Sequence, residues 1–144
     1  MNYFLRLNVV SILYAIMVFV PLELMLNVYR ISRITNWELS TVTTLSGIIS
    51  LVGIIAGTIL LYLLTNKWLN GRKRNYWTVI LWVPYFVLFV YSFAALFPVT
   101  YGGDDPNPGS GLIAIGGLIL YPLYILLINF VGMSGEDKSV SHPV

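Results

Sequence analysis

The chain has 144 residues, of which 58% are hydrophobic and only 10% are charged. Soluble domains are about 45–50% apolar and about 25% charged, so this composition excludes an ordinary soluble enzyme, a disordered segment and a coiled coil. The class of protein that fits this composition is an integral membrane protein. The net charge of +2 is explained by the positions of the basic residues in the chain and does not indicate nucleic-acid binding.

Four apolar segments follow one another along the chain, and each is long enough to cross a hydrocarbon core about 30 Å thick. The predicted spans cover residues 7–28, 42–64, 77–97 and 112–131. Because that core holds no water, the backbone must satisfy its own hydrogen bonds, which favours helices. The sequence therefore predicts an all-α integral membrane protein, a four-transmembrane-helix bundle that forms a single domain over residues 1–144.

The first span, residues 7–28, begins like a secretory signal, but no small-residue cleavage site follows and we expect an uncleaved helix. Its only charge is Glu23, and Asn27 and Arg30 follow on the same helical face. An ionisable residue within a span is a functional hypothesis by default, so these three residues form the candidate site. Two interpretations stay open: a structural residue that pairs with Arg30 near the membrane surface, and a cation or proton site that titrates at Glu23.

Small residues recur along the second span at intervals of three and four. This helix-packing seam comprises Thr43, Ser46, Ser50, Gly53 and Gly57, and the two glycines form a GxxxG motif. Small residues allow two helix backbones to approach closely, but the motif does not say which helix approaches. Packing inside the bundle and contact with a partner or a second copy are both open.

The segments between the spans are polar or rich in turn-forming residues. Thr35 and Glu38 have the spacing of a capping box, which predicts that the second helix starts shortly before its membrane part. Residues 70–74 form a basic turn, and residues 102–111 are so rich in glycine, proline and aspartate that neither helix nor strand is expected. The polar tail, residues 134–144, is expected to be mobile.

No catalytic or metal-binding constellation is visible. The chain has no cysteine, and its single histidine, His142, cannot form a ligand pair. Asp104, Asp105 and Asn107 supply three oxygen ligands where calcium needs six to eight, so we expect a solvated turn. No cofactor, metal or enzymatic activity is predicted.

Prolines and asparagines within the spans add two structural expectations. Pro21, Pro84 and Pro122 each remove one helical hydrogen bond, and the resulting bends either serve packing or line a transport path. Asn8 and Asn129 lie near the same end of their spans and can form hydrogen bonds across the bundle.

Basic residues are unevenly divided between the two sides of the predicted bundle. One side carries Arg6, Lys67, Arg72, Lys73, Arg74 and Lys138, and the other carries Arg30 and Arg33. Because cytoplasmic loops are enriched in lysine and arginine, we expect both termini in the cytoplasm.

Together these features predict a multi-pass protein of a bacterial plasma membrane. It is expected to act in the lipid bilayer through helix–helix association, as an accessory, regulatory or immunity-type partner of other membrane proteins or as a homo-oligomer. The alternative is a small transporter or channel-like protein in which Glu23 forms a cation or proton site. No nucleic-acid partner is expected.

Overall fold

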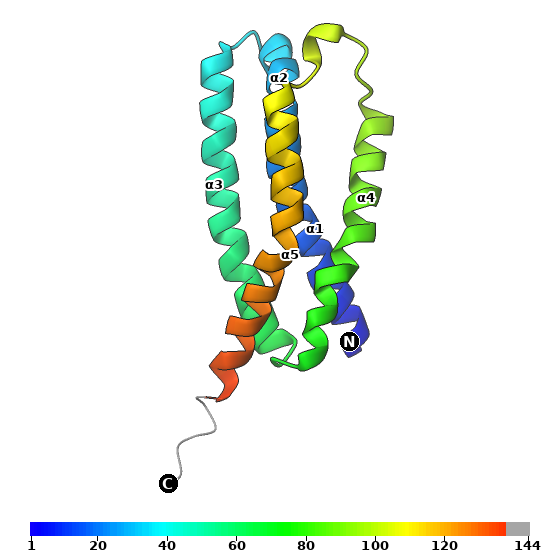
Figure 1. Ribbon diagram of the computed structural model, residues 1–144, viewed down its shortest axis with the longest axis vertical. Coiled ribbons are helices and arrows are strands. Elements are labelled where there is room, and N and C mark those ends of the chain that lie inside the picture. The colour runs from blue at the N-terminus through cyan, green and yellow to red at the C-terminus, as the bar shows by residue number, and fades with distance from the viewer. Residues whose placement is uncertain (138–144) are drawn as a thin grey trace.

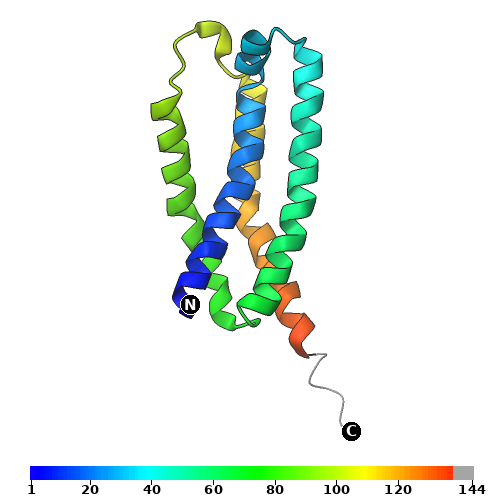
Figure 2. The same cartoon turned by 180° about the vertical axis from the view of Figure 1, so that it is seen from behind.

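The computed structural model describes residues 1–137, and helices are the only regular elements in that range (Figure 1 and Figure 2). Four of its helices are long and apolar enough to cross a membrane. They comprise Tyr3–Leu26, Leu39–Trp68, Lys73–Leu96 and Pro108–Gly135. The all-helical class is therefore confirmed, and four long apolar helices lie at the positions of the predicted spans, with bounds that differ by a few residues.

The long helices run up and down side by side. In chain order the elements are α1 (Tyr3–Leu26), α2 (Val28–Thr35), α3 (Leu39–Leu63), the π-helical turn η1 (Leu64–Trp68), the 3-10 turn η2 (Lys73–Trp77), α4 (Thr78–Leu96), the 3-10 turn η3 (Gly102–Asp104) and α5 (Pro108–Asp137). Helices α1 and α5 lie centrally, with α3 and α4 on either side (Figure 1). We name the end with the start of α1 and residues 69–72 the terminal end, and the end with α2 and residues 97–107 the loop end.

The connection between the first two spans contains a helix that was not predicted. Asn27 leaves the helical conformation, with φ −105° and ψ 15°, and separates α1 from α2. Asn36 takes a left-handed φ of 56° and ends α2. The predicted capping box is wrong, because the Thr35 hydroxyl donates to the Ile31 carbonyl at 2.7 Å and the side chain of Glu38 makes no capping bond to α3.

Residues 102–111 also contain helical structure, contrary to expectation. Residues 102–104 form η3, and α5 begins at Pro108, whose fixed φ suits the first helical position, where no N–H donor is needed. Asn107 caps this helix, because its Oδ1 accepts a hydrogen bond from the Gly109 backbone N–H at 2.8 Å. The segment 102–111, although rich in turn-forming residues, therefore contains the start of a helix.

At the terminal end, α5 continues beyond the predicted span. It reaches Asp137, so residues 134–137 of the predicted polar tail are helical. Gly132 lies against η1: a Cβ atom there would be 2.9 Å from Thr65 Cγ2, and Asn66 Nδ2 donates to the Gly132 carbonyl at 2.9 Å. Outside the described residues lie 138–144, with Lys138 and His142.

Close packing is concentrated in the half of the bundle toward the terminal end. The buried hydrophobic core comprises Leu7, Val10, Tyr14, Ala15, Leu61, Leu69, Trp82, Tyr121, Ile125 and Ile128. Buried polar groups join the helices here. Asn129 Nδ2 donates to Thr78 Oγ1 at 2.9 Å, and the Tyr85 hydroxyl donates to Asn8 Oδ1 at 2.6 Å. Asn8 and Asn129 each bond to α4, which confirms that they act across the bundle.

In the half toward the loop end, α3 and α4 diverge from the central pair (Figure 2). Three cavities of about 280, 260 and 370 Å³ share wall residues and lie between α3 and the helices α1 and α5. We call this space the α3 crevice. Its walls include Met17, Pro21 and Leu22 of α1, Ser46, Gly47, Ser50 and Gly53 of α3, and Gly117 of α5. Pro21 borders all three cavities, so the proline of α1 lies where the packing opens.

Candidate functional site

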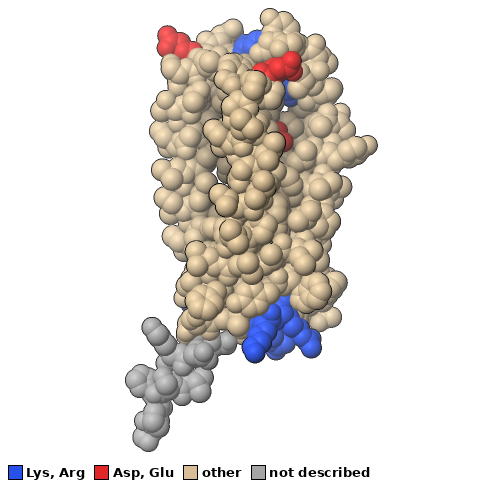
Figure 3. Space-filling view, in the orientation of Figure 1, with Lys and Arg blue, Asp and Glu red and all other residues tan. Residues whose placement is uncertain are grey.

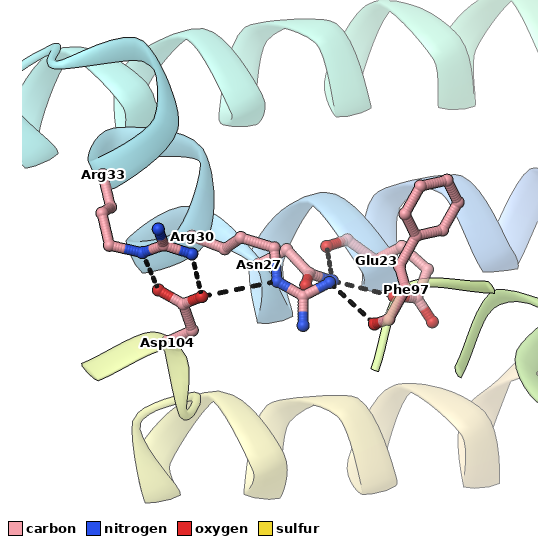
Figure 4. Close-up of polar contacts among 6 residues, drawn as sticks. All are labelled: Glu23, Asn27, Arg30, Arg33, Phe97 and Asp104. Carbon is pink, nitrogen blue, oxygen red and sulfur yellow. Dashed lines mark hydrogen bonds and ion pairs between the residues drawn. The ribbon is translucent and has the colours of Figure 1, made fainter. Parts of the chain in front are cut away.

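Glu23 lies near the end of α1 and borders a pocket of about 180 Å³ between α1, α4 and the loop that follows α4. We call it the Glu23 pocket. Asn27, at the break between α1 and α2, donates from Nδ2 to Glu23 Oε2 and to the Glu23 carbonyl, both at 2.9 Å (Figure 4). In Figure 3, acidic atoms are visible in a recess below the loop end. The structure thus brings Glu23 and Asn27 together.

Arg30 lies in the same pocket but bonds elsewhere. Its Nη1 donates to the Phe97 carbonyl at 2.9 Å, and its Nε lies 3.7 Å from Asp104 Oδ2. Within residues 1–137, no basic nitrogen lies within 4.0 Å of the Glu23 carboxylate. The predicted pairing of Glu23 with Arg30 is therefore wrong, because the turn at Asn27 places Arg30 on α2, next to the loop after α4.

Asp104 is the centre of an ion-pair network at the loop end. Its carboxylate is only 3% exposed and accepts two hydrogen bonds from Arg33, from Nε at 2.8 Å and from Nη2 at 2.6 Å. The Arg33 guanidinium also lies 5.1 Å from the centre of the Tyr101 ring. The expected solvated turn is therefore wrong at Asp104. We call the contact of Arg30 and Arg33 with Asp104 the loop clip.

Hydrogen bonding from Arg33 holds the pKa of the Asp104 carboxyl below its usual value, and the same bond raises the pKa of Arg33. Both groups are therefore charged at neutral pH. The clip ties α2 to η3 and so positions the loop that roofs the Glu23 pocket.

Sequence reasoning missed Arg33, Asp104 and Phe97 as members of this site. One signal was available: Arg30 and Arg33 are three residues apart and share a helical face, on the same side of the predicted bundle as the acidic loop. The Phe97 carbonyl gave no signal, because any residue there would supply the same acceptor. Among the described residues, no cluster of three histidine, cysteine, aspartate or glutamate side chains is arranged to hold a metal ion.

The helix-packing seam of α3 is divided between the interior and the α3 crevice. Ser46 is buried, and Gly57 packs on α1, where an added Cβ would lie 2.8 Å from Met17 Sδ. At Gly53, in contrast, an added Cβ would meet nothing within 4 Å. Of the other members, Thr43 and Gly53 are exposed and Ser50 is half-buried. Part of the seam therefore packs within the chain, and part faces unfilled space.

A scan against protein-family models, a search of the curated proteins and a search of the solved structures each gave no match for this chain. Its function is therefore inferred from the two features described above, the α3 crevice and the Glu23 pocket.

Proposed function

We propose that this protein binds a transmembrane helix of a partner protein in the α3 crevice. By this association it acts as an accessory, regulatory or immunity-type membrane protein. One observation carries the proposal: the open part of the small-residue seam faces a crevice rather than another helix of the same chain. At Gly53 an added side chain would meet no atom of this chain within 4 Å.

The two walls of the crevice suit a helix. Gly47 on α3 and Gly117 on α5 border the same cavity, and an added Cβ at either position would meet nothing within 4 Å. In a bilayer the lipid chains are as apolar as leucine, so helices associate through close van der Waals contact and hydrogen bonds. A partner helix between these glycines could approach α3 and α5 closely, and the nearby hydroxyl of Ser50 could bond to it.

The setting we propose is a bacterial plasma membrane, with both termini in the cytoplasm. Figure 3 shows basic side chains gathered at the terminal end. The basic residues there include Lys67, Arg72, Lys73 and Arg74. This distribution supports the orientation through the enrichment of lysine and arginine in cytoplasmic loops.

A matched pair of variants tests the association. Gly116 and Gly117 are adjacent on α5 and both have open space at Cβ, but only Gly117 borders the crevice. We expect Gly117→Leu and Gly53→Leu to abolish crosslinking to the partner in native membranes, and Gly116→Leu to leave it unchanged. The readout is mass spectrometry of the crosslinked products.

The identity of the crosslinked species decides between outcomes. A heterologous membrane protein that is lost in Gly117→Leu and Gly53→Leu supports the proposal. Crosslinks to a second copy of this chain would overturn the proposal of a heterologous partner and indicate a homo-oligomer instead. A protein that crosslinks to nothing, or equally in all three variants, overturns it.

One observation favours the alternative of a small transporter or channel. Glu23, an ionisable residue within a predicted span, borders a pocket of about 180 Å³ near the loop end, where a cation or proton could reach it. The test is ion flux in liposomes that contain the wild type or Glu23→Gln. Equal flux in both proteins, or none in either, removes this alternative.

A further inference from the structure

We propose that the Glu23 pocket binds the ammonium group of an organic amine. The Glu23 carboxylate and the Asn27 amide oxygen accept its hydrogen bonds, and the aromatic wall of α4 holds its apolar part. This site lies between α1 and α4, whereas the α3 crevice lies between α1, α3 and α5. The inference is therefore independent of the helix-binding proposal, and it does not require transport.

Of the two carboxylates that line the pocket, Glu23 is the one without an ion pair within 4.0 Å among the described residues. Asp104 is paired with Arg33 and lies near Arg30, and Arg30 also donates to the Phe97 carbonyl. Glu23 receives only the neutral amide of Asn27 on Oε2, and within the described range no basic nitrogen lies within 4.0 Å of it. A half-buried carboxylate without a cation is costly unless a positive group approaches it.

The amide of Asn27, which also lines the pocket, has one acceptor atom left. Its Nδ2 donates to both Glu23 Oε2 and the Glu23 carbonyl. Oδ1 is therefore the Asn27 atom that can accept a hydrogen bond from a ligand. A primary ammonium group has three donors, which match the two carboxylate oxygens of Glu23 and this amide oxygen.

The opposite wall is apolar and partly aromatic. It is formed by the last turns of α4, with Val90, Phe93, Ala94 and Phe97. The rings of Phe93 and Phe97 lie 5.1 Å apart between centroids, tilted by 40°. Aromatic faces beside a carboxylate suit an organic cation, because the ring electrons attract positive charge while the ring surface contacts alkyl groups.

Size and ligand number argue against a bare metal ion. The pocket of about 180 Å³ is far larger than the roughly 15 Å³ that one water molecule needs. Calcium takes six to eight oxygen ligands, and the only other carboxylate in this pocket is already bound by Arg33. A small molecule with one positive group and an apolar part fits the volume and the chemistry better.

The test uses the full chain in dodecyl maltoside micelles, with hexylamine as the probe. At pH 7 the amine is protonated, because alkyl ammonium groups of the lysine type have a pKa near 10.4. A ligand that binds only the folded state raises the unfolding midpoint, which is followed by tryptophan fluorescence. We expect a saturable rise with hexylamine and none with equimolar 1-hexanol.

Two glutamate variants locate the effect. Glu23→Gln should weaken the apparent affinity at least about tenfold, since it removes hydrogen bonds to a charged acceptor. Glu38→Gln is the matched control, because Glu38 is exposed in the connection between α2 and α3. An equal rise in the wild type and Glu23→Gln means that the amine acts through the micelle, and it excludes a free amine as the ligand.

A second pair of variants covers the case in which Glu23→Gln does not fold. Ala94 lines the pocket, and the exposed Ala95 is adjacent on α4 but does not border it. Ala94→Leu should fill the pocket and reduce the response to hexylamine, whereas Ala95→Leu should respond like the wild type. A full response in Ala94→Leu contradicts the assignment of this pocket.

The amine could be a free molecule or the headgroup of a lipid, and two arms of the experiment distinguish these sources. In the second arm, the protein is placed in phosphatidylglycerol nanodiscs with or without phosphatidylethanolamine. A Glu23-dependent stabilisation by hexylamine alone indicates a free amine, and one by phosphatidylethanolamine indicates a lipid amine. The absence of a Glu23-dependent effect in both arms overturns the proposal.

Discussion

The same four helices pack closely toward the terminal end and diverge toward the loop end. In the first half, Tyr14, Leu61 and Ile125 are at most 1% exposed, and Asn129 bonds across to α4. In α3, by contrast, no residue between positions 47 and 60 is buried, although Val42 and Ser46 nearer the loop end are.

The GxxxG motif lies within this open stretch of α3, whereas bulky side chains and interhelical hydrogen bonds fill the closed half. Small residues permit close approach, but in lipid they do not by themselves bring helices together. The open half is therefore where a second molecule can supply the missing contacts.

The largest effect on the free energy of unfolding should come from truncating a buried side chain in the closely packed half of the bundle, toward the terminal end. Ile125 is fully buried, so Ile125→Ala should lower the free energy of unfolding by about 2–4 kcal/mol through lost contacts and a residual cavity. Leu120, 61% exposed on the same helix, is the matched control, and Leu120→Ala should change it by less than about 0.5 kcal/mol. Equilibrium unfolding by sodium dodecyl sulfate in mixed micelles measures both. Equal losses would mean that the two halves do not differ in packing.

The two glycines of the GxxxG motif should respond differently to added bulk. Gly57→Leu must displace Met17, so we expect a loss of about 1–3 kcal/mol in the free energy of unfolding. Gly53→Leu enters open space and should be neutral within about 0.5 kcal/mol in the isolated protein. The same unfolding assay compares them. A large loss at Gly53 would show that α3 closes on α1 in the membrane.

Interhelical hydrogen bonding in the closed half should have a smaller effect. Asn129→Leu removes the bond to Thr78, and such bonds between membrane helices contribute about 0.6 kcal/mol on average and up to about 1.7 kcal/mol. We expect a loss in this range. Asn8→Leu, which removes the bond from Tyr85, should fall in the same range, and a neutral result for both would assign the closed half to apolar packing alone.

Acidification should have the smallest effect on global stability. Its effect should be confined to the loop that the loop clip holds. Because the pKa of Asp104 is lowered in the folded protein, the clip stabilises the loop above the usual aspartate value of about 3.9 and is lost as the pH falls through the lowered pKa. Hydrogen exchange in residues 98–107 should therefore increase only in strong acid. Asp104→Asn should show the increased exchange already at pH 7, and unchanged exchange in this variant would contradict the clip.

The spans were predictable because membrane thickness forces long runs without charge, and such runs are visible in the sequence. Helix α2 was not, because it is short, lies outside the four apolar spans and starts at a break set by the backbone of Asn27. The start of α5 could have been predicted, because Asn107 is a helix cap and Pro108 suits the first helical position. The glycines around these two residues instead favoured the prediction of a turn.

The candidate site was predictable only in part. Glu23 and Asn27 meet because they are four residues apart on one helix, which sequence spacing reveals. The partner of Arg30 depends on how the chain turns after Asn27 and on where the loop after α4 returns, and both are tertiary properties. The division of the seam at Gly53 and Gly57 likewise depends on the divergence of α3, which the spacing of small residues does not encode.

Gly132 brings the end of α5 onto η1, so the last of the four long helices completes contacts that the earlier segments cannot make alone. Helix α5 is the last of the four to leave the ribosome, yet it supplies the Gly132 carbonyl to Asn66 and the Asn129 amide to Thr78. Until then, the three earlier long helices have Asn66 and Thr78 without these partners from α5. In a bilayer, chains that stop before α5 would therefore leave the Asn66 amide without this acceptor, at a cost in free energy.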